Sequence, residues 1–242
     1  TILMAGIYEK HNKENFELYA FDNGEDDMSP LRKRIRDAFD HWIDIKSTPD
    51  QLAAKKIADL EIDILINLNG YYGNSRTSIF AYRPSPIQVN YLGFPGTLGA
   101  DYFDYLIADK TVIPIDSERH YSEKILRLPN CYQANDDKRL VSDKKYIRSD
   151  FGLPSNAFVY CCFNNSYKIT PKIFSVWMDI LKSTNNTVLW LLKDNDRVEQ
   201  NLRSYAGNFG ISQDRLFFST KIDPESHLAR HNLADLFLDT MP

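Results

Sequence analysis

One lysine stands where α/β proteins often bind an anion. Residues 158–163 (FVYCCF) are typical of a buried strand, and Thr170 and Pro171 are typical of the cap and first position of a helix. Lys168 lies in the short polar loop between them. The amide groups and the dipole of a helix's first turn favour negative charge, and a nearby ammonium strengthens that preference. This stretch therefore predicts a site for a phosphate-bearing ligand.

A later helix carries two histidines and an arginine. His227 and Arg230 are three residues apart and share a face, so they could pack against a nucleotide base or ribose, or form an ordinary exposed surface. His227 and His231 are four apart, a spacing that also fits a metal pair. Leu228, however, stands where the HExxH motif requires glutamate. We therefore predict no metal site here.

The ends of the strands select the other candidate segments, because ligands of open α/β sheets bind at the carboxyl ends of the strands. In the first half the rule selects residues 67–71 and 92–97, and in the second half it selects Asp239 and the segments 164–168, 193–195 and 219–222. A cleft between two such lobes would suit a two-part ligand such as a nucleotide sugar. No GxGxxG follows a strand and no GxxxxGK[ST] occurs, which argues against a dinucleotide oxidoreductase and a P-loop phosphotransferase.

Strands and helices alternate along the chain, which favours parallel sheets with helices on both faces. We expect strands over residues 16–21, 42–45, 62–68, 87–92, 105–108, 124–128, 158–163, 187–192, 216–219 and 236–238. Helix starts are expected at Ser29, Thr48, Arg76, Thr170, Asp196 and Asp223. Thr48 and Gln51 have the spacing of a capping box. The helix that follows them would bury Leu52, Ile57 and Leu60.

The bulk properties exclude several classes of protein. The 242 residues carry a formal net charge of −4, which argues against a broad nucleic-acid-binding surface. No apolar run approaches the ~18 residues of a membrane span, and no signal peptide opens the chain. Cys161 and Cys162 are adjacent in an apolar run, which indicates buried thiols in a reducing compartment such as the cytoplasm. We expect two lobes, residues 1–135 and 155–242, joined by the polar segment 136–154.

Several segments together resemble the O-linked N-acetylglucosamine transferase and SPINDLY family. They are residues 67–71 (NLNGY), 83–88 (RPSPIQ), 91–97 (YLGFPGT), 121–124 (YSEK), 163–169 (FNNSYKI), 188–192 (VLWLL) and 227–239. The resemblance covers nearly the whole chain and is greatest to the bacterial members, which lack the domain inserted between the lobes of the animal enzyme. It implies an α/β protein of the GT-B type, with two doubly wound Rossmann-type lobes facing a cleft.

The resemblance also implies an activity. The family's inverting transferases move N-acetylglucosamine from UDP-GlcNAc to Ser or Thr hydroxyls of proteins, without a metal or other cofactor. Lys168 matches the lysine that binds the donor diphosphate and stabilises the leaving group. Asn165 matches a donor-contacting position where animal enzymes have glutamine, and His227 and Arg230 match residues beside the uracil. The loop that meets the sugar is matched by Leu92, Gly93 and Pro95.

Parts of the family pattern fall outside the sequence. A His-Pro pair near the reacting centre would precede Thr1, and a His-Thr-Thr segment that cradles the diphosphate would follow Pro242. The tetratricopeptide repeats that usually precede the catalytic region are also missing. We therefore expect a fragment of a longer transferase, with its C-terminal lobe truncated, that is inactive or nearly so by itself. Two alternatives stay open: a transferase that uses another donor such as GDP-fucose, and a non-catalytic module that recognises proteins.

Overall fold

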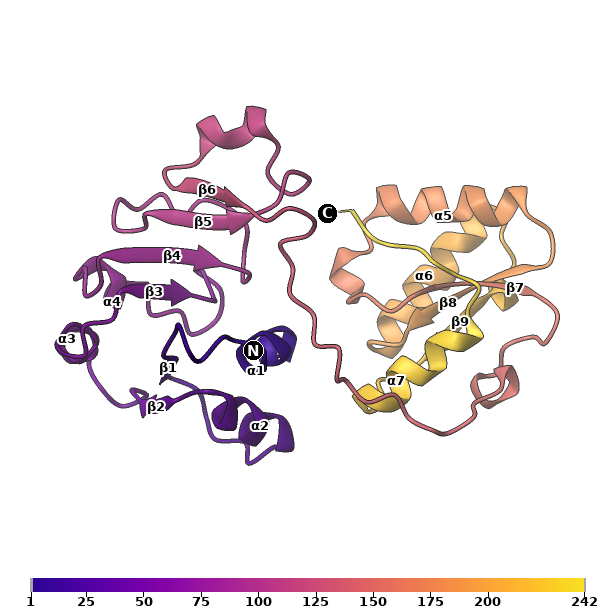
Figure 1. Cartoon of the computed structure of the whole chain (residues 1–242). Coiled ribbons are helices and arrows are strands. Elements are labelled where there is room, and N and C mark those ends of the chain that lie inside the picture. Colours follow the sequence, from indigo (N-terminus) through magenta and orange to yellow (C-terminus); the bar gives the residue numbers. More distant parts are fainter. Residues whose placement is uncertain (1, 242) are drawn as a thin grey trace. The chain divides into compact units, whose positions relative to one another are not determined.

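The structure, a computed structural model, describes residues 2–241 and divides the chain into two units (Figure 1). The first unit is Thr1–Lys138 and the second is Arg139–Pro242. Each has its own parallel sheets and its own hydrophobic core, as the alternation of strands and helices predicts. No helix among the described residues is long and apolar enough to cross a membrane.

The first unit contains two parallel sheets. A small one pairs β1 (Tyr19–Asp22) with β2 (His41–Asp44). The larger one has the order β3-β4-β5-β6 and is formed by β3 (Ile64–Asn67), β4 (Ile87–Tyr91), β5 (Tyr105–Ala108) and β6 (Lys124–Arg127). The helices are α1 (Ala5–Glu9), α2 (Pro30–Ala38), α3 (Asp50–Asp59) and α4 (Thr77–Ala81). Short 3₁₀ turns form at Ile2–Met4 and Ile115–His120.

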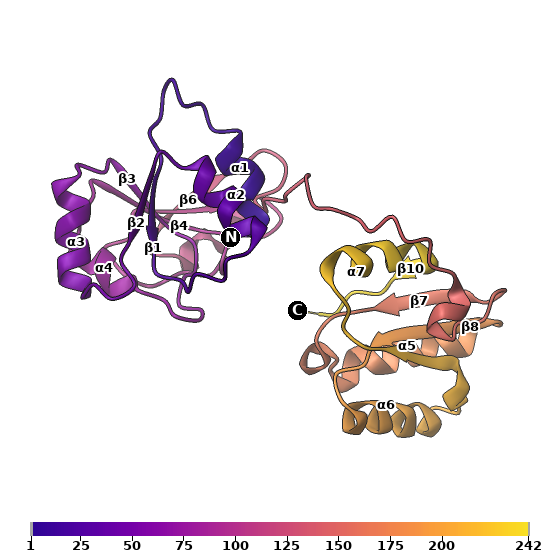
Figure 2. The ribbon, with the colours of Figure 1, turned by 90° about the horizontal axis from the view of Figure 1, so that it is seen from below.

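The second unit has one parallel sheet, in the order β10-β7-β8-β9. Its strands are β7 (Phe158–Cys162), β8 (Thr187–Leu192), β9 (Leu216–Ser219) and β10 (Leu236–Phe237). Its helices are α5 (Pro171–Ser183), α6 (Asp196–Asn208) and α7 (Pro224–Arg230). Figure 2 shows α5 and α6 on one face of the sheet and α7 on the other. Short 3₁₀ turns form at Arg148–Phe151, Ser166–Lys168, Gln213–Arg215 and His231–Leu233.

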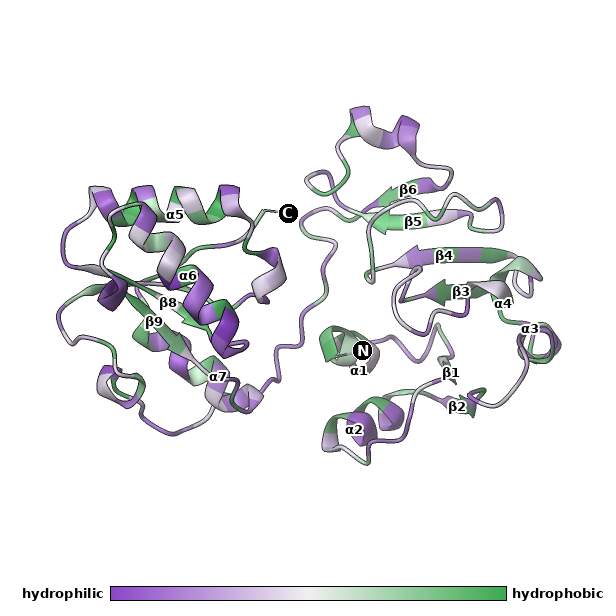
Figure 3. Ribbon diagram, turned by 180° about the vertical axis from the view of Figure 1, so that it is seen from behind, coloured by the Kyte–Doolittle hydropathy of each residue, from purple (hydrophilic) through white to green (hydrophobic). Residues whose placement is uncertain are grey.

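The core of the second unit explains why its strands are so apolar. Every residue of β8 is buried, since helices cover both faces and a strand lies on each side. Trp177 and Leu181 of α5 pack against Leu189 and Leu191 on one face, and Trp190 packs on the other. The strands of this unit are accordingly hydrophobic, whereas α6 contains many hydrophilic residues (Figure 3).

Local start signals succeeded at three helices and failed at one. Ser29, Thr170 and Asp223 each accept a backbone N–H of the first turn, as predicted. The capping box at Thr48 and Gln51 is wrong, because α3 is capped by Pro49, which forms no side-chain bond. Instead Arg76 donates to the carbonyl oxygen of Thr48 and ties this turn to α4.

The predicted apolar face of α3 is also partly wrong. Leu52 is 56% exposed, whereas Ala53, Ala54 and Ile57 are buried against Leu65. Small side chains allow the helix to approach the sheet closely, and this contact turns Leu52 outward. The strand expected over residues 16–21 begins only at Tyr19, because the bonded pairing with β2 starts there.

The segment between the predicted lobes is divided between the two units. Asp136 bonds through both carboxylate oxygens to Arg34 of α2, so it belongs to the first unit. Arg148 donates to the carbonyl oxygens of Ala157 and Leu233, and Leu153 is buried in the second core. Most of the polar stretch that we expected to be a connection is therefore part of the second unit.

Candidate functional site

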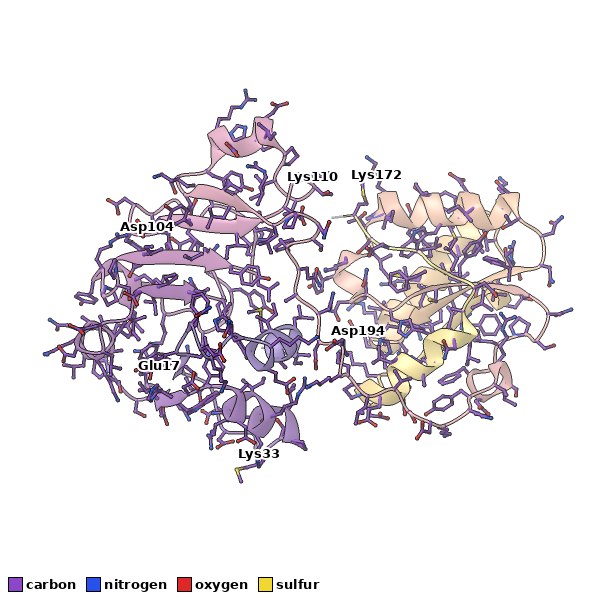
Figure 4. The ribbon with its side chains drawn as sticks, in the orientation of Figure 1. Glu17, Lys33, Asp104, Lys110, Lys172 and Asp194 are labelled. Carbon is purple, nitrogen blue, oxygen red and sulfur yellow. The ribbon has the colours of Figure 1, made fainter. Side chains whose placement is uncertain are left out.

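In the second unit, the loops that follow the four strands meet at one edge, because the strands are parallel neighbours. The Nδ2 atom of Asn164, after β7, donates to Asp239 Oδ1 (2.8 Å) and Thr240 Oγ1 (2.9 Å), after β10. Ser166 Oγ donates to Asp194 Oδ2, in the loop after β8 (2.6 Å; Figure 4). We call this group of loops the second-unit edge. These side-chain hydrogen bonds connect the loop after β7 to the loops after β8 and β10.

Lys168 ends the 3₁₀ turn of the loop after β7 and is exposed. Its ammonium takes part in none of the ion pairs of the described residues, whereas Lys193 on the next loop is paired with Asp196 and Glu199. The backbone N–H of Lys168 donates to the carbonyl oxygen of Asn165 (3.0 Å), which fixes these two predicted site residues relative to each other. An exposed, unpaired ammonium on a turn whose backbone is fixed can accept an anionic ligand.

The first turn of α5 offers fewer amide groups than the sequence led us to expect. Thr170 Oγ1 accepts the N–H of Ile173 (3.3 Å), and Pro171 has no N–H. The N–H of Thr170 itself donates to the carbonyl oxygen of Lys168 (3.0 Å). Lys168 is therefore the main source of positive charge at this position, with the helix dipole in support.

Arg230 of α7 is buried, with a relative exposure of 1%. Its guanidinium carbon lies 4.3 Å from the ring centroid of Phe163, which follows β7, and 5.9 Å from that of Trp190. Nη1 donates to the carbonyl oxygen of Thr220 (2.9 Å), and Nε donates to His227 Nδ1 (3.0 Å). The structure brings the predicted pair together, but Arg230 lies beneath His227 rather than beside it at the surface.

His227 is partly buried, and burial lowers its pKa to about 4, with a further contribution from the neighbouring charges of Arg230, His231 and Arg139. The imidazole is therefore neutral at neutral pH. His231 uses its Nδ1 to bond the carbonyl oxygen of His227 (2.6 Å). Within residues 2–241, no three His, Cys, Asp or Glu side chains gather in a way that could hold a metal ion.

Two aromatic residues of this edge were missed from the sequence, where we assigned the aromatic side chains to the core. Phe163 contacts the rings of both histidines edge-on, with centroid distances of 5.4 Å to His227 and 5.1 Å to His231. Trp190 lies under Arg230 and donates from Nε1 to Ser219 Oγ (2.7 Å). The signal available in the sequence was the position of Phe163 at the carboxyl end of the expected strand 158–163.

In the first unit, the loops after β3 and β4 meet at the corresponding edge, which we call the first-unit edge. A Cβ atom on Gly93 would lie 2.4 Å from the carbonyl oxygen of Leu68, so only glycine fits there. Leu92, immediately before it, has a φ of 71°, a left-handed backbone conformation that residues other than glycine rarely adopt. Pro95 is fixed by its carbonyl oxygen, which accepts the hydroxyl of Tyr121 (3.1 Å).

A buried carboxylate holds the remainder of this loop. Glu123 is 4% exposed and accepts the hydroxyl of Thr97 and the backbone N–H of Leu98, each at 2.7 Å. The hydroxyl of Tyr71, from the loop after β3, donates to the carbonyl oxygen of Leu98 (2.7 Å). The three predicted sugar-contacting residues thus lie in a loop that is held by its neighbours on both sides.

Two hollows on the first unit contain no residue of the first-unit edge. One, of about 450 Å³, is lined by α1 and α2 residues, among them Glu9, Lys33 and Arg34. The other, of about 550 Å³, lies beside Trp42 and the acidic turn after β1. Their charged side chains are largely paired with each other, as in Arg34 with Glu9 and Lys33 with Asp37. Neither hollow contains a predicted site residue.

Comparison with known proteins identifies relatives along the whole chain. The family described as "Glycosyl transferase family 41" matches residues 1–146 and 142–242. The chain is 41% identical over 243 residues to a probable UDP-N-acetylglucosamine–peptide N-acetylglucosaminyltransferase SEC of Arabidopsis thaliana, which covers 98% of this chain and 25% of the relative. It is 30% identical to a probable SPINDLY enzyme of Eustoma exaltatum subsp. russellianum, with 96% of this chain and 26% of the relative covered. The chain thus spans about a quarter of the length of these relatives.

Solved structures give the fold. An O-GlcNAc transferase mutant of Thermobaculum terrenum aligns with 99% of this chain and 45% of its own, at a TM-score of 0.88 and 26% identity. A glycosyltransferase from Rickettsia africae aligns with 93% of this chain and 64% of its own, at a TM-score of 0.55; at 12% identity it supports the fold alone. The matched family, the curated relatives and the parallel α/β units agree with the resemblance found in the sequence. This chain belongs to glycosyl transferase family 41 and has the GT-B type of fold.

Proposed function

We propose that the protein containing this chain transfers N-acetylglucosamine from UDP-GlcNAc to Ser or Thr hydroxyls of proteins, with inversion at the anomeric carbon. The family match and the names of its curated relatives support the donor and the peptide acceptor. The observation that carries the proposal is Lys168, an exposed and unpaired cation at the second-unit edge. This is the type of group that a departing diphosphate requires.

In the proposed reaction, the acceptor hydroxyl oxygen attacks the anomeric carbon from the side opposite the diphosphate. A new carbon–oxygen bond forms, and the bond to the diphosphate oxygen breaks, so that UDP leaves with the electron pair. The hydroxyl proton passes to a base to which we assign no residue of this chain. Negative charge grows on the diphosphate during this step, and the ammonium of Lys168 stabilises it more in the transition state than in the ground state.

The remaining predicted residues have binding roles in this proposal. Asn165 lies next to the diphosphate, because its backbone is bonded to that of Lys168. His227 meets the nucleotide, and the backbone of Leu92, Gly93 and Pro95 meets the sugar. Since Lys168 supplies the positive charge, the proposed reaction uses no metal ion or other cofactor. The formal net charge of −4 is the reason to propose that the protein binds no nucleic acid.

We assign the protein to the cytoplasm on the basis of its cysteines. Cys161 and Cys162 are free and buried in β7, and burial raises the pKa of Cys161 to about 12. Such thiols are unreactive and suit a reducing compartment. Alkylation during denaturing lysis of cells, followed by mass spectrometry, would show reduced cysteines if this assignment holds, and an intermolecular disulfide at the exposed Cys131 would contradict it.

Nucleotide binding by the whole protein tests the donor. Isothermal calorimetry should detect UDP binding, and we expect Lys168→Ala to weaken it by about 10-fold or more, the effect of losing a hydrogen bond to a charged group. Lys172→Ala removes another exposed lysine at the start of α5 and is the matched control (Figure 4). Tighter binding of GDP than of UDP would favour a fucosyl donor, and binding of neither would favour a protein-recognition module.

Transfer itself is tested with the whole protein. With labelled UDP-GlcNAc and an acceptor peptide, Lys168→Ala should lower kcat by about 100-fold or more, because a group that stabilises developing charge contributes about 3 kcal/mol. The same variant should have the same midpoint of urea unfolding as the wild-type protein, since the side chain is exposed and unpaired. Full turnover by Lys168→Ala would refute the assigned role.

A further inference from the structure

A buried arginine supports the histidine of the second-unit edge. The guanidinium of Arg230 is packed on Phe163 and Trp190, and its Nη1 is bonded to the carbonyl oxygen of Thr220. Burial in this apolar setting lowers the pKa of Arg230, but an arginine remains protonated in proteins. The group is therefore a fixed cation that is shielded from solvent, with one N–H directed at His227.

The hydrogen bond between these residues determines the tautomer of His227. Every nitrogen of a guanidinium is a donor, so the Nε of Arg230 can only donate to His227 Nδ1, at 3.0 Å. Nδ1 must then lack a proton, and the neutral ring carries its proton on Nε2. Within residues 2–241, Nε2 has no hydrogen-bond partner, and the ring is partly exposed. A donor is therefore available to a ligand at the surface.

The surroundings of the ring keep this state stable. The groups that face it are Arg230 at the end of α7, His231 at the start of the following 3₁₀ turn, Phe163 after β7, and Arg139 at the start of the second unit. The charged groups in this set are positive, and they disfavour a second proton on the imidazole. The bond from His231 Nδ1 to the carbonyl oxygen of His227 fixes the helix backbone at the same point.

From this geometry we infer that Arg230 is a positioning residue that acts through His227. It holds the imidazole as the Nε2–H tautomer, so that His227 donates a hydrogen bond to an acceptor oxygen of a nucleoside diphosphate. Arg230 itself does not touch the ligand. The inference rests on the proposed function for the identity of the ligand, but the tautomer and the shielding of Arg230 rest on the contacts within this chain.

Nuclear magnetic resonance tests the first half of the inference without a variant. Long-range ¹H–¹⁵N spectra of the 242-residue chain should show His227 with an unprotonated Nδ1 and a protonated Nε2 at every pH from 5.5 to 8. An Nδ1–H tautomer, or titration of His227 within this range, would overturn the inference.

A double-mutant cycle tests the second half. By calorimetry with UDP at pH 7.5, we expect His227→Ala and Arg230→Met each to weaken binding by about 2- to 10-fold, the range of one hydrogen bond. If Arg230 acts only through His227, the double variant should bind no more weakly than His227→Ala. Losses that multiply would show that Arg230 contacts the nucleotide directly and would overturn the inference.

The controls distinguish failure of this inference from failure of the proposed function. Arg215 bonds the carbonyl oxygens of Thr184 and Thr187 at the opposite, amino-terminal end of β8, so Arg215→Met should change stability but leave UDP affinity within 2-fold. If the wild-type whole protein binds no UDP, the donor assignment fails, and the tautomer of His227 then decides the inference alone. If Arg230→Met does not fold, the wild-type spectra decide it in the same way.

Discussion

The two edges are built in different ways, although each lies at the carboxyl ends of parallel strands. The first-unit edge is shaped mainly by backbone: a Cβ on Gly93 would meet Leu68, and Leu92 has a positive φ. The buried carboxylate of Glu123, just before β6, accepts the N–H of Leu98 and holds the same loop. The second-unit edge is formed by side chains: Lys168 is unpaired and His227 is held by Arg230. One edge provides shape, and the other provides charge and hydrogen-bond donors.

This difference separates stability from binding. A backbone contact cannot be changed without moving the chain, so substitutions at the first-unit edge should cost folding free energy. An exposed charge has little effect on stability, because water already solvates it in the folded state. We therefore expect substitutions at the second-unit edge to alter ligand binding while the protein stays folded.

The largest expected difference between the two units is in their stability at acid pH. Seven carboxyl groups of the first unit have a lowered pKa, against three in the second; in the first they are Glu9, Asp27, Asp40, Asp50, Asp109, Asp136 and Asp137, and in the second Asp196, Glu199 and Asp223. Hydrogen bonds from Arg34 lower the pKa of Glu9 and Asp136 to about 2. A carboxyl whose folded pKa lies below its unfolded value of about 4 stabilises the fold above pH 4, and that contribution is lost as the pH falls towards 2.

The first unit should therefore unfold at a higher pH than the second. Hydrogen exchange followed by mass spectrometry at pH 6, 4 and 2.5 would resolve the two units separately. Arg34→Met should destabilise the first unit at pH 6 and reduce its further loss on acidification, because the carboxylates no longer have their partner. Earlier opening of the second unit would contradict this comparison.

The next largest effect is expected for Gly93→Ala. A methyl group at this position would meet backbone atoms of Leu68 and Asn69 at 2.4–2.8 Å, so the loop must move, at a cost of about 3 kcal/mol of unfolding free energy. Urea unfolding measures it. Gly207→Ala, in α6 with no atom within 4 Å of the added methyl, should be neutral or stabilise by about 0.5–1 kcal/mol. Equal stability of the two variants would disprove the backbone contact.

A smaller loss is expected for Glu123→Ala. It leaves the N–H of Leu98 and the hydroxyl of Thr97 without their acceptor, which costs about 1–3 kcal/mol when the groups are buried. The amide of Leu98 should exchange faster with solvent, while that of Ile113, fixed by the carbonyl oxygen of Asp109, should not change. Unchanged exchange at Leu98 would mean that Glu123 does not hold the loop.

The smallest effect on stability is expected at the second-unit edge. Ser166→Ala removes the hydroxyl that donates to Asp194, a bond between exposed groups, and should change the unfolding free energy by less than about 1 kcal/mol. UDP affinity should fall at the same time, because the turn that carries Lys168 is no longer fixed. A change in stability without a change in affinity would reverse the contrast between the two edges.

The sequence by itself determined the features that depend on nearest neighbours along the chain. The alternation of apolar strands with capped helices predicted the parallel sheets, and Ser29, Thr170 and Asp223 predicted three helix starts. Lys168 was found because it lies between a strand and a helix cap, a purely local pattern. Family motifs then selected Leu92, Gly93 and Pro95, which have no reactive side chains that residue type alone could identify.

Only the tertiary structure decided how distant segments meet. The burial of Arg230 depends on Phe163 and Trp190, from two other parts of the chain, so its spacing from His227 could not distinguish an exposed pair from a supporting one. The need for glycine at position 93 comes from Leu68, 25 residues earlier. Local propensity sets secondary structure, but burial and hydrogen-bond partners arise from contacts that form only when the chain is folded.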